Sequence, residues 1–206
     1  MKLLHIDSSI SGETSASRQL SAALVAALTH ALPDLDVMRR DLDEDPIPHL
    51  DGNLLRAILP TTADAFGEEQ GTAALEEFLA ADIVVIGAPM YNFTVPSQLK
   101  AWIDRILIAG KTFRYTETGA VGLAAGRKVI IASSRGGLYA PGMPHVANDF
   151  QETYLRAVFR FIGIDDVTIV RAEGLALSPG HREAAIRAAL ASVPQAVTGF
   201  VTRRAA

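Results

Sequence analysis

Residues 83–93 read IVVIGAPMYNF, and this stretch decides the fold class. Its first part, Ile83 to Ile86, is a short and uninterrupted aliphatic run, which is typical of a strand covered on both faces. Similar runs recur along the chain, although the one at 36–40 is weaker. Together they predict strands over residues 3–6, 36–40, 83–86, 129–132 and 167–170.

Segments with a helical period separate these strands. Leu99, Trp102, Ile103, Ile106 and Leu107 follow the i, i+3, i+4, i+7, i+8 pattern of a helix with one buried face. Similar spacing predicts four more helices: one with Leu20, Leu24, Leu28 and Leu32, one over 68–79 with Leu75, Phe78 and Leu79 facing inwards, and two over 150–162 and 182–193. Strands that alternate with helices indicate an α/β fold, with a mostly parallel sheet and helices on both faces. Residues 41–67 are the least regular, and we expect a short helix there, within one domain over residues 1–206.

Composition narrows the function classes. The 206 residues include 19 basic and 23 acidic side chains, for a formal net charge of −4, and 49% are apolar, which describes a folded protein rather than a disordered one. Because there is no basic tract, the chain is a poor candidate for binding nucleic acid or a membrane surface. The absence of cysteine excludes disulfides, thiol nucleophiles and thiolate metal sites. Any redox chemistry must therefore come from a bound cofactor.

Targeting and metal-binding signals are also missing from the sequence. The start, MKLLHID, has a short apolar run followed at once by an acid, unlike a signal peptide, and no run approaches the roughly 18 apolar residues of a membrane span. We therefore expect a cytoplasmic protein. The five histidines are scattered without ligand spacing, so we expect no metal site.

Three loops that follow predicted strands carry groups unusual for plain connections. In an open parallel sheet, ligands bind outside the carboxyl ends of the strands. Residues 8–17 are rich in hydroxyls and end where a helix begins, which suits a phosphate, although serines in this position also serve as plain N-caps. Both interpretations of this loop stay open. There is no GxGxxG or GxxxxGK[ST] motif for a dinucleotide or a P-loop site.

The other two loops suggest a planar ligand. In residues 88–93, Tyr91 and Phe93 flank Asn92. The aromatic side chains would supply flat apolar walls and Asn92 an amide for a ring edge, or else Tyr91 and Phe93 simply pack a turn. In residues 133–139, Gly136 and Gly137 either let main-chain amides approach a ligand or form a flexible turn. All three loops meet at one sheet edge, and together they fit a mononucleotide with a flat ring, best FMN.

Motifs along nearly the whole chain resemble those of the FMN-dependent NADH-azoreductase (quinone reductase) family. The resemblance is carried by Ser8-Ser9, Ser15-x-Ser17, Ala88 to Phe93, Phe113-Arg114-Tyr115-Thr116, Ser134 to Gly137 and Phe161 to Ile164. It implies a flavodoxin-like three-layer sandwich, with a five-stranded parallel sheet of order 2-1-3-4-5. It also implies a homodimer with active sites at the interface. Hydride would pass from NADH or NADPH through FMN to quinones and azo compounds, in two-electron, ping-pong steps.

The resemblance also implies roles for individual residues. Those that would bind FMN are Ser9, Ser15, Ala16 and Ser17 at the phosphate, Met90, Tyr91, Asn92 and Phe93 along the ring, and Ser134, Arg135, Gly136 and Gly137 at its other end. Tyr115, Tyr139 and Phe161 would contact the substrate, with Phe161 reaching in from the partner subunit. The chain departs from some relatives at Leu59, where they have Arg, and at Tyr139, where they have His. These departures concern the substrate range and the choice between NADH and NADPH.

No side chain is required as a catalytic acid or nucleophile, because the cofactor performs the hydride chemistry. The main alternative is a flavodoxin-type electron carrier, which binds FMN but has no small-molecule substrate of its own. A hydrolase is a third possibility, but the sequence has neither a GxSxG elbow nor a cluster of metal ligands.

Overall fold

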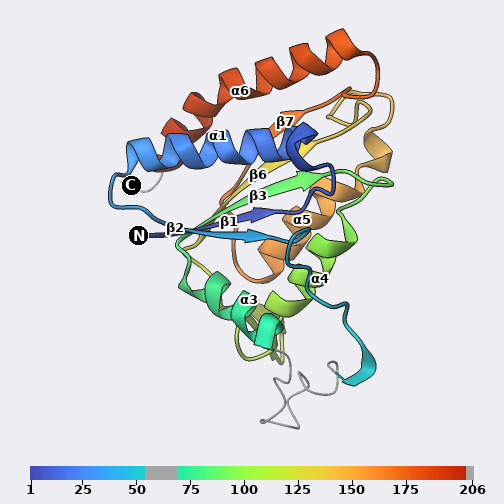
Figure 1. The fold of residues 1–206 in the computed structure, drawn as a ribbon. Helices are drawn as coiled ribbons and strands as arrows, with labels where there is room; N and C mark the ends of the chain where they lie inside the picture. Colours follow the sequence, from blue (N-terminus) through green and yellow to red (C-terminus); the bar gives the residue numbers. More distant parts are fainter. Residues whose placement is uncertain (54–68, 203–206) are drawn as a thin grey trace.

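The computed structural model describes residues 1–53 and 69–202, which form a five-stranded parallel sheet between two layers of helices (Figure 1). The strands lie in the order β2-β1-β3-β6-β7. Their bounds are Lys2–Asp7 for β1, Asp36–Asp41 for β2, Ile83–Pro89 for β3, Lys128–Ser134 for β6 and Val167–Ala172 for β7. The remaining two strands form a separate hairpin. When only the five strands of the sheet are numbered along the chain, their order is 2-1-3-4-5, as predicted. The predicted fold class is confirmed.

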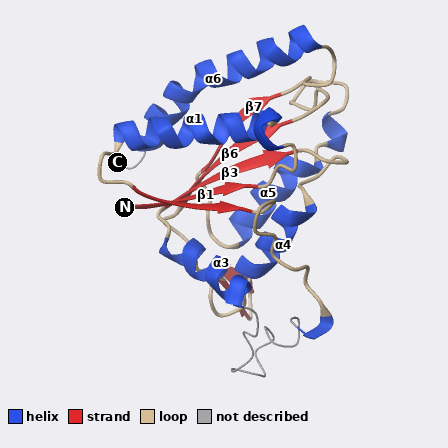
Figure 2. Ribbon diagram, viewed as in Figure 1, coloured by secondary structure: helices blue, strands red, loops and turns tan. Residues whose placement is uncertain are grey.

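Helices cover both faces of the sheet (Figure 2). On one face lie α1 (Ala16–Ala31) and α6 (Pro179–Thr202), which pack against each other. On the other face lie α3 (Glu69–Ala80), α4 (Ser97–Ile106) and α5 (Phe150–Phe161). Short 3₁₀ turns occur at Gly12–Thr14 and Val146–Asn148.

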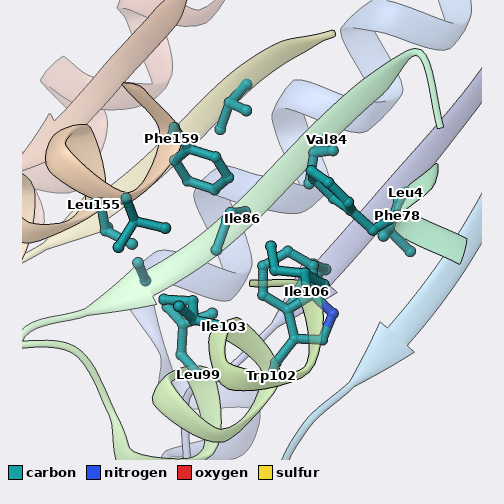
Figure 3. Close-up of a cluster of buried hydrophobic side chains, with 14 of the residues drawn as sticks. Leu4, Phe78, Val84, Ile86, Leu99, Trp102, Ile103, Ile106, Leu155 and Phe159 are labelled. Carbon is teal, nitrogen blue, oxygen red and sulfur yellow. The ribbon is translucent and has the colours of Figure 1, made fainter. Parts of the chain in front are cut away.

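Two hydrophobic clusters form the core, one on each face of the sheet. Every residue of β3 is buried, as the aliphatic run at 83–86 predicts. On the face of α3, α4 and α5, Trp102 and Phe78 meet edge to face with ring centroids 5.9 Å apart (Figure 3). On the other face, Leu20, Leu24 and Leu28 of α1 are fully buried. Because both faces of β3 are covered, its carboxyl end is held firmly at the centre of the sheet edge.

Two elements differ from the sequence-based predictions. Helix α6 was expected to end at residue 193, before Pro194, but it continues to Thr202. Burial of Val197 and Phe200 offsets the hydrogen bond that proline cannot donate. The hairpin of β4 (Phe113–Thr116) and β5 (Gly119–Gly122) was not predicted, because each strand has only four residues.

The environment of Gly122 explains where this hairpin lies. A Cβ atom at Gly122 would overlap the main chain of Ile162 and Gly163, just past α5. The hairpin therefore packs against the end of α5. Residues 54–68 and 203–206 lie outside the described part of the chain, and so do Leu59, the first residue of the helix predicted over 68–79, and most of the helix expected within 41–67.

Helix α6 is long and apolar enough to cross a membrane by length and composition alone. One such helix is weak evidence for a membrane protein, because core helices of soluble proteins meet the same criteria. Here α6 packs against α1 and β7 and buries Ala189, Val193, Val197 and Phe200.

Candidate functional site

A cavity of about 450 Å³ opens at the carboxyl edge of the sheet, where β1, β3 and β6 end side by side. Eight of the predicted cofactor-binding residues line it: Ser9, Ser15, Ala16, Met90, Tyr91, Ser134, Arg135 and Gly136. The other lining residues are Ser11, Thr14, Pro89, Leu175, Ala176 and Arg182. The structure therefore brings the three predicted loops together at one site.

Neutral hydroxyls surround the start of α1 at one end of this cavity. Ser15 is the N-cap, and its Oγ accepts a hydrogen bond from the amide of Arg18 (3.3 Å). Ser17 is fully buried and does not line the cavity, but its Oγ lies 3.0 Å from that of Ser15. The amides of a first helical turn have no carbonyl partner within the helix and carry its positive dipole end. Hydroxyls and amides in this arrangement suit a phosphate.

Gly87 in β3 allows the start of α1 to lie this close to the sheet. A Cβ atom there would be 2.6 Å from Oδ1 of Asp7 and 3.4 Å from the carbonyl oxygen of Ser17. The same carboxylate oxygen accepts a hydrogen bond from Ser21 Oγ of α1 (2.8 Å). The small residue in the strand therefore helps to place residues 8–17, which we call the hydroxyl loop.

The side chain of Arg18 binds the main chain of the hydroxyl loop. Its Nε and Nη2 donate to the carbonyl oxygen of Ser9 (3.1 and 2.8 Å), and its guanidinium also pairs with Asp41. Burial alone would raise the pKa of Asp41, but the hydrogen bond and charge of Arg18, together with main-chain hydrogen bonds from Asp43 and Glu44, outweigh it and lower that pKa. The charge of Arg18 is thus neutralised by Asp41.

The turn at residues 90–93, which we call the aromatic turn, forms the wall between the 450 Å³ cavity and a neighbouring one of about 850 Å³. Met90 and Tyr91 line both cavities, whereas Asn92 lines only the larger. The Tyr91 hydroxyl lies 3.2 Å from Ser9 Oγ, which links the aromatic turn to the hydroxyl loop. Asn92 and Phe93 have φ values of 47° and 72°, a conformation that a residue as bulky as phenylalanine rarely adopts. Phe93 is 49% exposed and lines neither cavity.

Residues 134–137, which we call the glycine loop, pair with the loop after β7. Main-chain carbonyls of Gly136 and Gly137 accept hydrogen bonds from the amides of Ala176 (3.0 Å) and Gly174 (2.9 Å). Gly137 does not line the cavity, and a Cβ atom there would lie 3.0 Å from the Tyr139 ring. This pairing makes the end of β7 part of the site.

The guanidinium of Arg135 is fully buried among carboxylates. It pairs with Asp149 (3.0 Å), Glu173 (3.0 Å) and Glu152, and Glu152 also pairs with Arg171. Burial would raise the pKa of Glu152, but Arg171 and Arg135 together lower it. Because its charge is balanced in this way, the Arg135 guanidinium is not available to a ligand.

The three predicted substrate residues do not line the cavity of this chain. The Tyr139 ring meets Phe93 edge to face with centroids 6.4 Å apart, and its amide donates to Glu173 (3.0 Å). Tyr115 and Phe161 both contact Phe113 instead, with centroid distances of 5.4 and 4.7 Å. Tyr115 is 74% exposed and Phe161 38% exposed. We call Phe113, Tyr115 and Phe161 the hairpin patch.

Sequence reasoning missed Leu175, Ala176 and Arg182, which come from the segment after β7. The rule that ligands bind beyond the carboxyl ends of strands applies to this strand too, and would have pointed to this segment. The segment has no glycine-rich or aromatic motif that would have singled it out.

The residues of the cavity fit FMN. Neutral hydroxyls and the start of α1 suit its phosphate, and Met90 and Tyr91 supply flat apolar surface for its ring. Among the lining residues that the structure describes there is no carboxylate to repel the phosphate.

Comparisons with known proteins agree with this geometry. Residues 1–197 match a family described as having a flavodoxin-like fold. The chain is 59% identical over 196 residues to the FMN-dependent NADH:quinone oxidoreductase of Methylocella silvestris, covering 92% of this chain and 95% of that protein. It is 56% identical over 193 residues to the protein of the same name from Xanthomonas oryzae, covering 94% and 95%. Among solved structures, the FMN-dependent NADH-azoreductase of Bacillus anthracis in complex with FMN is 28% identical, with a TM-score of 0.85 and coverage of 97% and 98%.

Proposed function

Because this chain belongs to the flavodoxin-like family of FMN-dependent NADH:quinone oxidoreductases, we propose that it transfers hydride from NADH through bound FMN to quinones and azo compounds. The family resemblance noted in the sequence is thus confirmed. The observation that carries the proposal is the cavity at the sheet edge, where a hydroxyl loop, an aromatic turn and a glycine loop meet.

Each loop has a separate task in this proposal. Ser9, Ser15 and Ala16 bind the phosphate directly, and Ser17 supports Ser15. The turn at 90–93 lines the ring, and residues 134–137 close its other end. When bound, FMN supplies the redox chemistry by accepting hydride from NADH and passing it to the acceptor.

The protein contributes position and environment rather than an acid or a nucleophile. No Asp, Glu, His or Lys is found among the residues lining the cavity in the described part of the chain. Main-chain amides near Asn92 and Gly137 would stabilise negative charge that develops at the ring. Holding donor and ring in contact accounts for much of the expected acceleration.

A flavodoxin-type carrier is the competing function. The cavity of about 850 Å³ on the other side of Met90 and Tyr91 favours an enzyme, because it offers room for a small organic substrate. We expect the purified protein with FMN to oxidise NADH continuously when benzoquinone is added and no other protein is present. A single stoichiometric oxidation followed by arrest would indicate a carrier instead.

We also propose a homodimer in which the hairpin patch of one subunit covers the cofactor cavity of the other. Two of its three side chains, Tyr115 and Phe161, are exposed, and neither lines the cofactor cavity or the neighbouring cavity of its own chain. Sedimentation equilibrium is expected to give twice the 21.9 kDa of the chain. A monomeric mass that persists at micromolar concentration in a protein that turns over quinone would contradict this arrangement.

For location, we propose the cytoplasm, because the donor NADH is supplied there. Cell fractionation is expected to recover the protein with the cytosolic enzymes. Recovery with membranes would contradict this location and would turn attention to α6.

A further inference from the structure

Arg182 reaches the cofactor cavity from the far end of the chain. Ser178 immediately precedes α6: its Oγ accepts a hydrogen bond from the amide of His181 (3.2 Å), and its carbonyl oxygen accepts one from the amide of Arg182 (2.9 Å). This places Arg182 in the first turn of the helix. Its guanidinium donates to the carbonyl oxygen of Thr14, a residue 168 positions earlier and adjacent to Ser15. Arg182 also lines the cavity.

Helix stability does not explain this placement. A positive charge in the first turn of a helix is opposed by the helix dipole, which favours acidic residues there. Within the described residues, Arg182 forms no ion pair with a carboxylate. In contrast, Arg18 is paired with Asp41, and Arg135 with Asp149, Glu152 and Glu173. Arg182 therefore brings an unneutralised positive charge to the phosphate end of the cavity.

We propose that Arg182 binds the phosphate of the cofactor and makes the site select phosphorylated flavin. This inference rests on the proposed function. A phosphate monoester carries nearly two negative charges at neutral pH. The serines and amides at the start of α1 are uncharged donors, so Arg182 supplies a full positive charge that they lack. A guanidinium has five N–H groups, so bonding Thr14 leaves donors for phosphate oxygens.

The test compares FMN with riboflavin, which has the same ring but no phosphate. Dissociation constants are measured by quenching of flavin fluorescence. The main variant is Arg182→Gln, which removes the charge but keeps an amide donor for Thr14. The matched control is Arg187→Gln on the same helix, where Arg187 pairs loosely with Glu183 (3.8 Å) and both side chains are 72% exposed. Both variants change the net charge by the same amount.

We expect Arg182→Gln to weaken FMN binding about tenfold, as for a partly exposed charged pair, and riboflavin binding by less than about twofold. Arg187→Gln should leave both constants unchanged. Arg182→Lys should recover much of the FMN affinity. Raising the salt concentration should weaken FMN binding to the wild type more than to Arg182→Gln, because salt screens the charged pair.

Equal loss of affinity for both flavins, or no loss for either, would overturn the role of Arg182 while leaving FMN binding by the wild type intact. A wild-type protein that binds neither flavin would overturn the proposed function and this inference with it. The two failures are therefore distinguishable, and neither readout depends on turnover.

Discussion

Replacement of Ser15 by aspartate is expected to weaken FMN binding by at least about a hundredfold while the fold survives. Aspartate is as good an N-cap as serine and is favoured by the helix dipole, so α1 should keep its start. The new carboxylate would face the phosphate. Two like charges about 5 Å apart repel by about 3 kcal/mol at an effective dielectric constant of about 20, or about two orders of magnitude in affinity.

Ser15→Asn is the matched control, because asparagine has nearly the same shape and also caps helices but is uncharged. It should bind FMN within about fivefold of the wild type. Fluorescence titration gives the two constants, and thermal unfolding shows whether both variants are folded. If Ser15→Asp, with a wild-type melting temperature, bound FMN as well as Ser15→Asn does, the phosphate would not lie at the start of α1.

Replacement of Arg135 by methionine is expected to destabilise the protein by about 3–5 kcal/mol at pH 7. The change leaves Asp149, Glu152 and Glu173 close together without the buried cation that they surround. Arg160→Met is the control: its pair with Asp165 is almost fully exposed, so its loss should change the free energy of unfolding by less than about 1 kcal/mol. Denaturant unfolding measures both values. Similar values for the two variants would show that the Arg135 cluster contributes no more than a surface pair.

The stability that the paired carboxylates contribute depends on pH. The pKa values of Glu152 and Asp41 are lowered in the folded protein. The stability that they contribute is therefore present above the unfolded pKa values near 4 and is lost as pH falls through the lower folded values. The wild type should lose stability over this range. The deficit of Arg135→Met should shrink as its buried carboxylates become protonated.

The parts of the fold that local patterns determine could be predicted. The run at 83–86 is aliphatic without interruption because both faces of β3 are covered, and the period from Leu99 to Ile106 follows the buried face of α4. Position in a parallel sheet then brought three loops to one edge. The parts that depend on distant residues could not be predicted. Pro194 reads as a helix end, but Val197 and Phe200 find a buried surface beyond it.

The contacts within the site also join residues that are far apart in the sequence, and these could not be predicted. The glycines after Arg135 indicated a ligand loop, but the carboxylates that surround its guanidinium come from α5, from the N-cap of α5 and from the loop after β7. No local signal links residue 135 to residues 149, 152 and 173. Arg182 was missed for a similar reason, because it contacts Thr14, a residue 168 positions earlier in the sequence.

The visible spectrum of the protein, taken after addition of FMN, removal of unbound flavin and then addition of NADH under argon, tests the central claim most directly. We expect oxidised-flavin bands to remain with the protein and to bleach when NADH is added. Subsequent addition of benzoquinone should restore them. A protein that retains no flavin, or flavin that NADH does not bleach, would contradict the assignment of this cavity as the site of an FMN-dependent oxidoreductase.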